Sequence, residues 1–270
     1  MDLGEIERRG LGLLGCGKMG SALLKGWLAQ GIAPGAVRVV EPQPSDWLNA
    51  TGVHVNQGFG AAPAFVVVAV KPQMMGQALP ELAALGGGGT VVLSIAAGTT
   101  IAAFEAALGA ATPVIRAMPN TPAAIGRGIT AICANDKVGP ARLDQAEALL
   151  SAVGQVVRLE GEHQMDAVTA VSGSGPAYVF HLIETLALAG QAEGLPADLA
   201  LALARATVSG AGALAETVAE DPAELRRNVT SPGGTTAAAL AVLMDEERGF
   251  PALLKAAVHA AAERGRELAK

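Results

Sequence analysis

The stretch that decides the fold of this chain is Leu11-Gly12-Leu13-Leu14-Gly15-Cys16-Gly17-Lys18-Met19-Gly20. A short apolar strand leads directly into a GxGxxG pattern, and a helical segment follows. In this pattern Gly15 permits a tight turn, Gly17 lets a ligand approach the backbone, and Gly20 allows the helix to pack close to the sheet. The stretch predicts the first βαβ unit of a Rossmann-type domain that binds a dinucleotide; the alternative is a glycine turn with a structural role only.

An acidic residue stands where dinucleotide-binding domains place one. Glu41 ends the second apolar run, about 20 residues after Gly20. A carboxylate at this point pairs with the ribose hydroxyls of NAD, and its charge repels the 2′-phosphate of NADP. Because Lys18 and Ser45 could still contact a phosphate, the choice between NADH and NADPH stays open, and Glu41 favours NADH.

Short β-branched runs alternate with helical segments from Gly10 to about Leu159, which is the pattern of a doubly wound parallel sheet. The apolar continuity of the runs indicates strands that are buried on both faces. The predicted strands are residues 11–15, 36–41, 65–70, 90–95, 113–117, 128–134 and 155–159.

Beyond residue 159 the chain reads as helices, separated by Gly194-Leu195-Pro196, Asp221-Pro222 and Gly249-Phe250-Pro251. We therefore expect a Rossmann-type α/β domain over residues 1–162 and an all-helical domain over residues 163–270. The helices carry wide apolar faces with few charges, which a domain of this size would not cover alone. Association of two copies through the helical domain is therefore expected.

The composition narrows the class of protein. The 270 residues are 51% hydrophobic and 16% charged, with 3% aromatic residues and a net charge of −6. This balance gives no basic surface for nucleic acid or anionic lipid. The two cysteines, Cys16 and Cys133, indicate neither a disulfide framework nor a metal site. We expect a cytoplasmic protein that binds small molecules and copies of itself, with no membrane span and no metal.

A second cluster of glycines and hydroxyls opens a helical run near the C-terminus, at Val229-Thr230-Ser231-Pro232-Gly233-Gly234-Thr235-Thr236. The start of a helix exposes unpaired N–H groups and the positive end of the helix dipole. Such a turn is suited to binding a small carboxylate. An ordinary Ser/Thr helix cap is the alternative interpretation.

With these segments in order, the chain resembles the pyrroline-5-carboxylate reductase family along nearly its whole length. The blocks that carry the resemblance are Gly15-Cys16-Gly17-Lys18-Met19, Val70-Lys71-Pro72-Gln73, Arg116-Ala117-Met118-Pro119-Asn120-Thr121-Pro122, Ser172-Gly173-Ser174-Gly175-Pro176-Ala177-Tyr178 and the turn from Val229 to Thr236. The resemblance implies a Rossmann domain, a helical domain that interlocks with a partner subunit in a homodimer or larger oligomer, and reduction of 1-pyrroline-5-carboxylate to L-proline by NADPH or NADH.

The resemblance also implies which residues form the site. Those matching the dinucleotide-lining positions are Gly15, Cys16, Gly17, Lys18, Met19, Gly20, Asn56, Val70, Lys71, Pro72, Ala96, Ala97 and Gly98, to which the residue pattern adds Glu41. Those matching the substrate-binding positions are Glu162, Ser231, Gly234, Thr235 and Thr236. The hydroxyl of Thr236 is expected to hydrogen-bond the ring nitrogen of the imine as it becomes an amine.

Departures from the family pattern occur at Lys18, Glu41 and Arg205, and they bear on cofactor choice more than on reaction type. A related β-hydroxyacid dehydrogenase is the nearest alternative enzyme. Such dehydrogenases resemble one another in using a lysine early in the helical domain, and this chain has no lysine between Lys137 and Lys255, which disfavours that reaction. A non-catalytic dinucleotide sensor is a second alternative, but it would not need the turn from Ser231 to Thr236.

Overall fold

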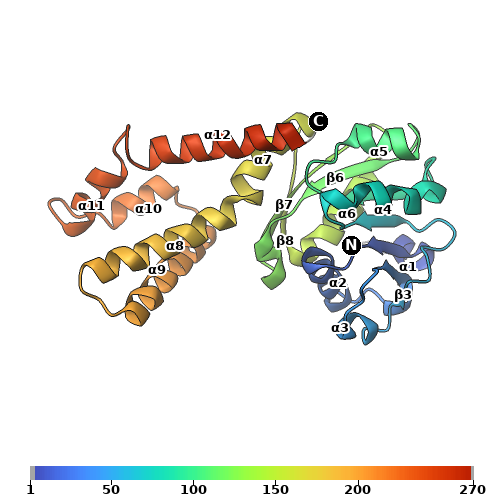
Figure 1. Cartoon of the computed structure of the whole chain (residues 1–270), viewed down its shortest axis with the longest axis horizontal. Helices are drawn as coiled ribbons and strands as arrows, with labels where there is room; N and C mark the ends of the chain where they lie inside the picture. The colour runs from blue at the N-terminus through green and yellow to red at the C-terminus, as the bar shows by residue number, and fades with distance from the viewer. Residues whose placement is uncertain (1–3, 269–270) are drawn as a thin grey trace. The chain divides into compact units, whose positions relative to one another are not determined.

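The computed structural model describes residues 4–268, which fold as two compact units (Figure 1). Among the described residues, the first unit comprises residues 4–173 and 262–268, whereas the second unit is Ser174–Ala261. The final helix therefore contributes to both units. The division into functional domains at residues 1–162 and 163–270 stays a prediction.

The first unit contains an eight-stranded sheet over the described residues, in the order β3-β2-β1-β4-β5-β6-β7-β8. The strand order reverses at β1, which pairs in parallel with both β2 and β4, and ligands bind at such switch points in open α/β sheets. The strands are β1 (Leu11–Leu14), β2 (Val37–Val40), β3 (His54–Val55), β4 (Phe65–Val68), β5 (Val91–Ser94), β6 (Val114–Met118), β7 (Gly128–Ala134) and β8 (Gly154–Arg158).

Two features of the sheet differ from the expectation. The edge strand β3, with only two residues, was not predicted. The doubly wound sheet is mostly parallel as predicted, and the exception that was not predicted is β7, which runs antiparallel to β6. The link between these strands holds only the short 3-10 helix η4 (Thr121–Ile125), and a parallel crossover needs a connection of about a dozen residues or more.

Helices cover both faces of the sheet, as a doubly wound fold requires. Along β4, Phe65 and Val67 belong to one buried cluster, while Val66 and Val68 belong to another. The helices of the unit are α1 (Gly4–Arg9), α2 (Lys18–Ala29), α3 (Asp46–Asn49), α4 (Met75–Leu82), α5 (Ile101–Leu108), α6 (Pro140–Leu150) and α7 (Met165–Val168). Short turns of helix are η1 (Pro34–Ala36), η2 (Pro72–Met74), η3 (Ala83–Leu85), η5 (Ser151–Val153), η6 (Glu162–Gln164) and the π-helix η7 (Thr169–Gly173).

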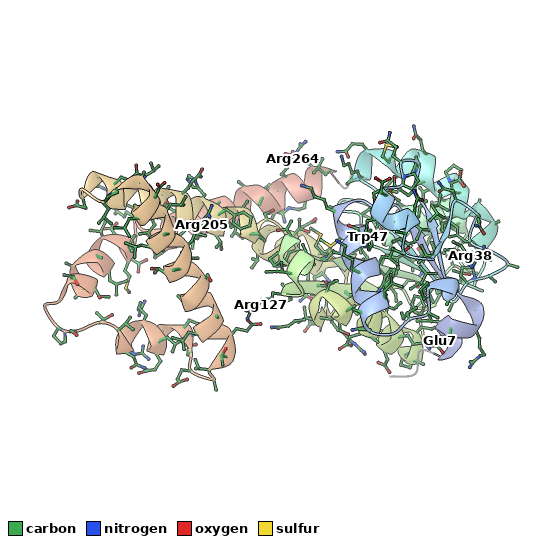
Figure 2. All side chains as sticks on the ribbon, turned by 90° about the horizontal axis from the view of Figure 1, so that it is seen from below. Glu7, Arg38, Trp47, Arg127, Arg205 and Arg264 are labelled. Carbon is green, nitrogen blue, oxygen red and sulfur yellow. The ribbon has the colours of Figure 1, made fainter. Side chains whose placement is uncertain are left out.

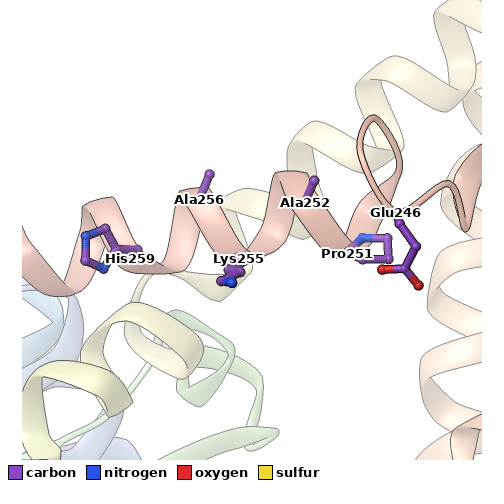
Figure 3. A pocket seen from close by; sticks show the side chains of 6 residues that line it. All are labelled: Glu246, Pro251, Ala252, Lys255, Ala256 and His259. Carbon is purple, nitrogen blue, oxygen red and sulfur yellow. The ribbon is translucent and has the colours of Figure 1, made fainter.

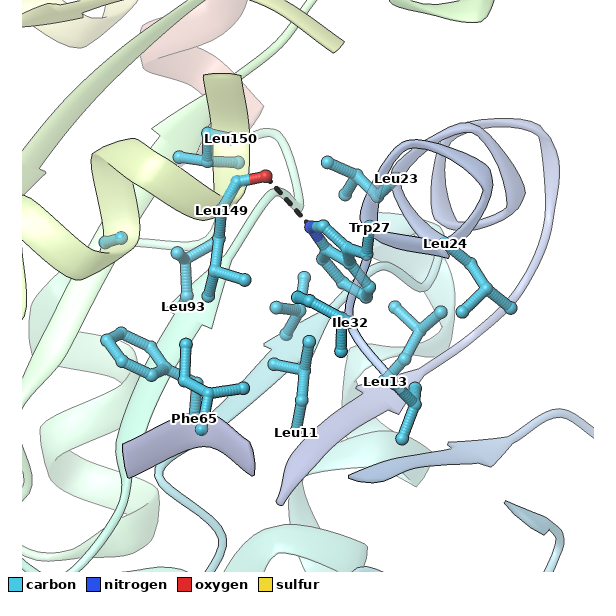
Figure 4. Close-up of a cluster of buried hydrophobic side chains, with 14 of the residues drawn as sticks. Leu11, Leu13, Leu23, Leu24, Trp27, Ile32, Phe65, Leu93, Leu149 and Leu150 are labelled. Atoms are coloured by element: carbon cyan, nitrogen blue, oxygen red, sulfur yellow. Dashed lines mark hydrogen bonds between the residues drawn. The ribbon is translucent and has the colours of Figure 1, made fainter. Parts of the chain in front are cut away.

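One tryptophan joins two helices on the face covered by α2 and α6. Trp27 of α2 is fully buried, and its indole N–H donates to the carbonyl oxygen of Leu149 in α6 at 2.9 Å (Figure 4). A buried indole needs such a partner, because leaving its donor unpaired would cost roughly 1–3 kcal/mol. The contact holds α2, and with it the loop before it, against the sheet.

The second unit is helical, as expected. Its helices are α8 (Gly175–Ala192), α9 (Ala197–Thr217), α10 (Pro222–Asn228), α11 (Thr235–Leu243) and α12 (Phe250–Leu268). The predicted stop and start signals are confirmed: α9 begins directly after Pro196, Asp221 caps α10 through its side chain, and α12 begins at Phe250.

The buried core of the second unit is small. Its buried cluster consists of Ala187 from α8 and Ala200 and Ala204 from α9, with Ile183 and Leu201 packed partly against them. These small side chains let α8 and α9 approach closely. Because each alanine buries little apolar area, the core of the unit is small.

Candidate active site

The glycine loop after β1 has the geometry that its sequence predicts. Gly15 has a φ of +90°, and a Cβ there would lie 2.9 Å from Val70 Cγ1. A Cβ at Gly20 would lie 2.4 Å from the carbonyl oxygen of Gly15. Only glycine therefore fits at the turn and at the point where α2 passes the loop.

The start of α2 is open to a ligand. Gly17 is the cap residue and offers no side-chain hydrogen bond, and a Cβ on it would meet nothing within 4 Å. The first turn of α2 carries no acidic residue, so the positive end of its dipole is not neutralised within the helix. Lys18 is exposed and Met19 is half-buried. Unpaired N–H groups, a positive potential and open space together fit the pyrophosphate of a dinucleotide.

Glu41 and Asn56, from two different strand ends, meet at this loop. Glu41 Oε2 accepts a hydrogen bond from the N–H of Cys16 at 2.7 Å. Asn56 Oδ1 accepts from the N–H of Glu41, and Asn56 Nδ2 donates to the carbonyl oxygen of Glu41, both at 2.9 Å. Asn56 has a φ of +55°, a left-handed conformation that asparagine tolerates better than most residues. The carboxylate is thus held at the edge of the glycine loop.

The same arrangement affects the thiol in the loop. Burial and the negative charge of Glu41 raise the pKa of Cys16 to about 11, against a smaller opposite effect of Lys25. Cys16 is therefore neutral at physiological pH, and it is its backbone N–H that contacts Glu41.

The segment after β4 borders the glycine loop. Val70 is the residue that a Cβ on Gly15 would strike. Lys71 is exposed and extended, as the residue before a proline should be, and Pro72 begins η2. Lys71 therefore presents a cation at the carboxyl edge of the sheet, where the resemblance places the dinucleotide.

The segment after β5 is fixed by a buried hydroxyl. Ser94 is fully buried, and its Oγ accepts from the N–H of Ala96 at 3.2 Å. Ala96 is buried, Ala97 is half-buried, and Gly98 has a φ of +76°. These residues form a tight bend between β5 and α5.

Glu162, the predicted substrate contact, lies in an ion pair. Its Oε1 accepts from Arg116 Nη1 at 2.8 Å and from the N–H of Ile101 at 2.9 Å. The Arg116 side chain is 6% exposed and that of Glu162 is 30% exposed. This pair was not predicted from the sequence, although a charged residue inside the apolar run of β6 was a signal for it. The substrate contact of Glu162 stays a prediction.

A second polar link joins the same region to the π-helix. Asn120 Nδ2 donates to the carbonyl oxygen of Ser172 at 3.2 Å, and Asn120 Oδ1 accepts from the N–H of Ile129 at 3.0 Å. A Cβ on Gly173 would lie 2.6 Å from Met118 Cε. The glycine and serine block around Gly173 was predicted to be a close-packing turn, and Gly173 does pack closely against the end of the Met118 side chain.

The predicted carboxylate-binding turn lies in the second unit. Gly234 caps α11 without a side-chain hydrogen bond, and its N–H donates to the carbonyl oxygen of Ser231 at 3.0 Å. The amide of Gly234 is therefore used by the turn itself. The N–H groups of Thr235 and Thr236 lie in the first turn of α11, where no preceding helical carbonyl can accept from them. Ser231 and Thr235 are exposed and Thr236 is half-buried.

A cavity of about 590 Å³ in the second unit contains none of the predicted site residues. Figure 3 shows its lining, which comes from one side of α12 and from Glu246 in the preceding loop. The helical residues are Pro251, Ala252, Lys255, Ala256 and His259. This hollow is a groove along a single helix rather than a built ligand site.

The comparisons with known proteins agree with this geometry. A family model described as "NADP oxidoreductase coenzyme F420-dependent" matches residues 10–98, and one described as "Pyrroline-5-carboxylate reductase dimerisation" matches residues 162–268. The fold and the glycine loop thus define an NAD(P)-dependent oxidoreductase with a Rossmann-type domain and a helical dimerisation domain.

Full-length relatives identify the family. Pyrroline-5-carboxylate reductase from Synechocystis is 44% identical over 267 residues, covering 96% of this chain and 98% of the relative. The enzyme from Pseudomonas aeruginosa is 41% identical over 266 residues, covering 96% and 97%. The chain belongs to the pyrroline-5-carboxylate reductase family.

Solved structures of the family superpose closely. The pyrroline-5-carboxylate reductase of Coxiella burnetii has a TM-score of 0.90 at 34% identity, covering 97% of this chain and 99% of that chain. Plasmodium falciparum pyrroline carboxylate reductase, solved with NADP bound, has a TM-score of 0.83 at 29% identity, covering 98% and 99%.

The region of the dimerisation match carries exposed apolar residues. Helix α9 is long and apolar enough to cross a membrane by length and composition, and 11% of its most apolar window is buried. Exposed leucines on it include Leu199, Leu203 and Leu214. The helix lies within the dimerisation match, and this match supports association of the chain with a second copy of itself. Kinship with biosynthetic reductases favours a soluble protein.

Proposed function

We propose that this protein reduces 1-pyrroline-5-carboxylate to L-proline with NADPH or NADH, the last step of proline biosynthesis. The observation that carries the proposal is the turn from Ser231 to Thr236 at the uncapped start of α11, in a chain whose other unit holds the glycine loop. We also propose that residues 1–162 and 163–270 are the functional domains, and that the enzyme works in the cytoplasm.

In this proposal the cofactor lies on the switch point of the sheet. Its pyrophosphate faces the loop from Gly15 to Gly20, and its ribose faces Glu41, which Asn56 orients. The segments from Val70 to Pro72 and from Ala96 to Gly98 line the rest of the dinucleotide. The bound dihydronicotinamide supplies a hydride for the C=N bond.

The turn before α11 would bind the substrate carboxylate. The N–H groups of Thr235 and Thr236 are available, and the Ser231 hydroxyl is exposed beside them. Gly234 contributes by holding the shape of the turn, because its own N–H bonds to Ser231. The positive end of the α11 dipole strengthens the interaction.

The hydroxyl of Thr236 is proposed to hydrogen-bond the ring nitrogen. Protonation of this nitrogen makes the neighbouring carbon more electrophilic, so the protein has to orient the imine and exclude water more than it has to supply a strong base. This requirement agrees with a site of hydroxyls and backbone amides without a His–Asp pair.

The proposal is tested by following NADPH and NADH oxidation separately, with 1-pyrroline-5-carboxylate as substrate and proline identified as product. Proline formation with either cofactor supports it. Cofactor binding without proline formation would contradict it and favour a sensor.

A further inference from the structure

Arg116 is a charged side chain inside the core of the first unit. It lies in β6 between buried neighbours and is 5% exposed as a residue. A buried guanidinium has a high desolvation cost unless it is paired and hydrogen-bonded. Its position thus requires a specific partner.

That partner connects Arg116 to the start of α5. Glu162 Oε1 accepts from Arg116 Nη1 and also from the N–H of Ile101, the first residue of α5. Thr100 caps the same helix, because its side chain accepts from the N–H of Ala103. A carboxylate at a helix N-terminus is favourable, so Glu162 has two reasons to stay in place.

The bend between β5 and α5 is therefore fixed at both ends. At its beginning, the buried Ser94 hydroxyl accepts from the N–H of Ala96. At its end, Glu162 accepts from the N–H of Ile101. Ser94 is also the register partner of Arg116 across β5 and β6, so one anchor and the arginine that holds the other lie on neighbouring strands.

We propose that Arg116 is a positioning residue for the cofactor: it holds Glu162 against the N-terminus of α5 and thereby fixes the bend that includes Ala96, Ala97 and Gly98. The inference rests on the proposed assignment of this bend to the dinucleotide. It gives Glu162 a supporting role beside the cofactor, distinct from a direct contact with substrate.

The test uses three variants and a matched control. Glu162→Gln keeps an oxygen that can accept from Ile101 but loses the charge that pairs with Arg116. Arg116→Met removes the guanidinium, and a double variant completes the cycle. Arg158→Met is the control, because it breaks ion pairs of similar chemistry with Asp144 and Glu147 on the exposed surface of the same unit.

The decisive measurement is the dissociation constant of NADPH and of NADH without substrate, followed by the KM for the cofactor and for the imine substrate. We expect Arg116→Met to weaken cofactor binding roughly tenfold or more, since a small misplacement of a binding segment is costly. Glu162→Gln should weaken it less, and the double variant should be no worse than Arg116→Met. The KM for the imine substrate should change little, and Arg158→Met should match the wild type.

Unchanged cofactor affinity in Glu162→Gln, with a raised KM for the imine substrate, would overturn the inference and support a substrate contact. Equal cofactor affinity in all folded variants would also overturn it. If Arg116→Met does not fold, Glu162→Gln carries the test alone. Because cofactor binding is measured without turnover, a failure of the proposed reaction would leave this result readable.

Discussion

Glu41 and Cys16 are joined by a hydrogen bond of 2.7 Å from the backbone N–H of Cys16 to the Glu41 carboxylate. This bond brings a fixed negative charge from the end of β2 to the glycine loop, and Asn56 secures the Glu41 backbone with two further hydrogen bonds. The geometry is suited to accepting ribose hydroxyls and opposes a phosphate at the same place.

Replacing Glu41 should therefore change cofactor preference. In Glu41→Ser the ratio of kcat/KM for NADPH to that for NADH is expected to rise roughly tenfold or more, because a like-charge repulsion is removed. Steady-state kinetics with both cofactors measures the ratio. Glu81→Gln, which removes an exposed carboxylate near the C-terminal end of α4, should leave the ratio unchanged. An unaltered ratio in Glu41→Ser would remove this role.

Thr236→Val should lower kcat while leaving the turn intact. Valine keeps the shape of threonine but loses the hydroxyl, and loss of one positioned donor reduces turnover about tenfold to a thousandfold. Rapid kinetics at saturating substrate measures the effect. Thr217→Val is the matched control, because that hydroxyl donates to the carbonyl oxygen of Ala213 within its own helix. A normal rate in Thr236→Val would refute the proposal.

Gly20→Ala should abolish cofactor binding. The new Cβ would lie 2.4 Å from the carbonyl oxygen of Gly15, and backbone on both sides must move to relieve the contact. Gly76→Ala in α4 provides the comparison, since its Cβ would meet nothing within 4 Å. Calorimetric titration with NADH should show binding for Gly76→Ala and none for Gly20→Ala. Equal affinities would mean that the loop accommodates a Cβ at position 20 without losing the cofactor.

Leu203→Glu should prevent dimer formation. Leu203 is 48% exposed on α9 in the unit that matches the dimerisation family, and a charge there would be buried without a partner on association. Light scattering should show the mass of a monomer, and circular dichroism would report any loss of helix in the second unit. Val157→Glu on the exposed edge strand β8 should leave the dimer intact. A Leu203→Glu dimer of normal size would place the interface elsewhere.

The Cys16 thiol should reduce stability at high pH. Its pKa is about 11 in the folded protein, above the ordinary value of 9.0, so the fold favours the neutral thiol. This contribution is fully present below pH 9 and is lost as the pH rises through about 11. Urea unfolding across this range should show the stability of wild type falling more steeply than that of Cys16→Ala. Parallel curves would contradict the raised pKa.

The sequence predicted most of the first unit because its strands are long apolar runs and its glycines have conformations that few other residues adopt. Strand β3 was not predicted because two residues, His54 and Val55, are too few to show the alternation of a strand. The reversed direction of β7 is a property of the connection rather than of the strand pattern.

The site was predictable where a single residue type carries the geometry, as at Gly15 and Gly20. It was not predictable where partners are distant in sequence: Arg116 and Glu162 are 46 positions apart, and no local pattern links them. The hydrogen bond from the Gly234 N–H to Ser231 within the turn also depends on backbone geometry that the residue types do not determine.

The alanine core of the second unit has a thermodynamic consequence. Its buried alanines supply little of the free energy that offsets the ordering of α8 to α11, and we expect burial of its exposed leucines against a second chain to add to it. Dilution should therefore lower the stability of the second unit, and the melting temperature of this unit should rise with protein concentration. The folded fraction of the second unit would then depend on subunit concentration as well as on temperature.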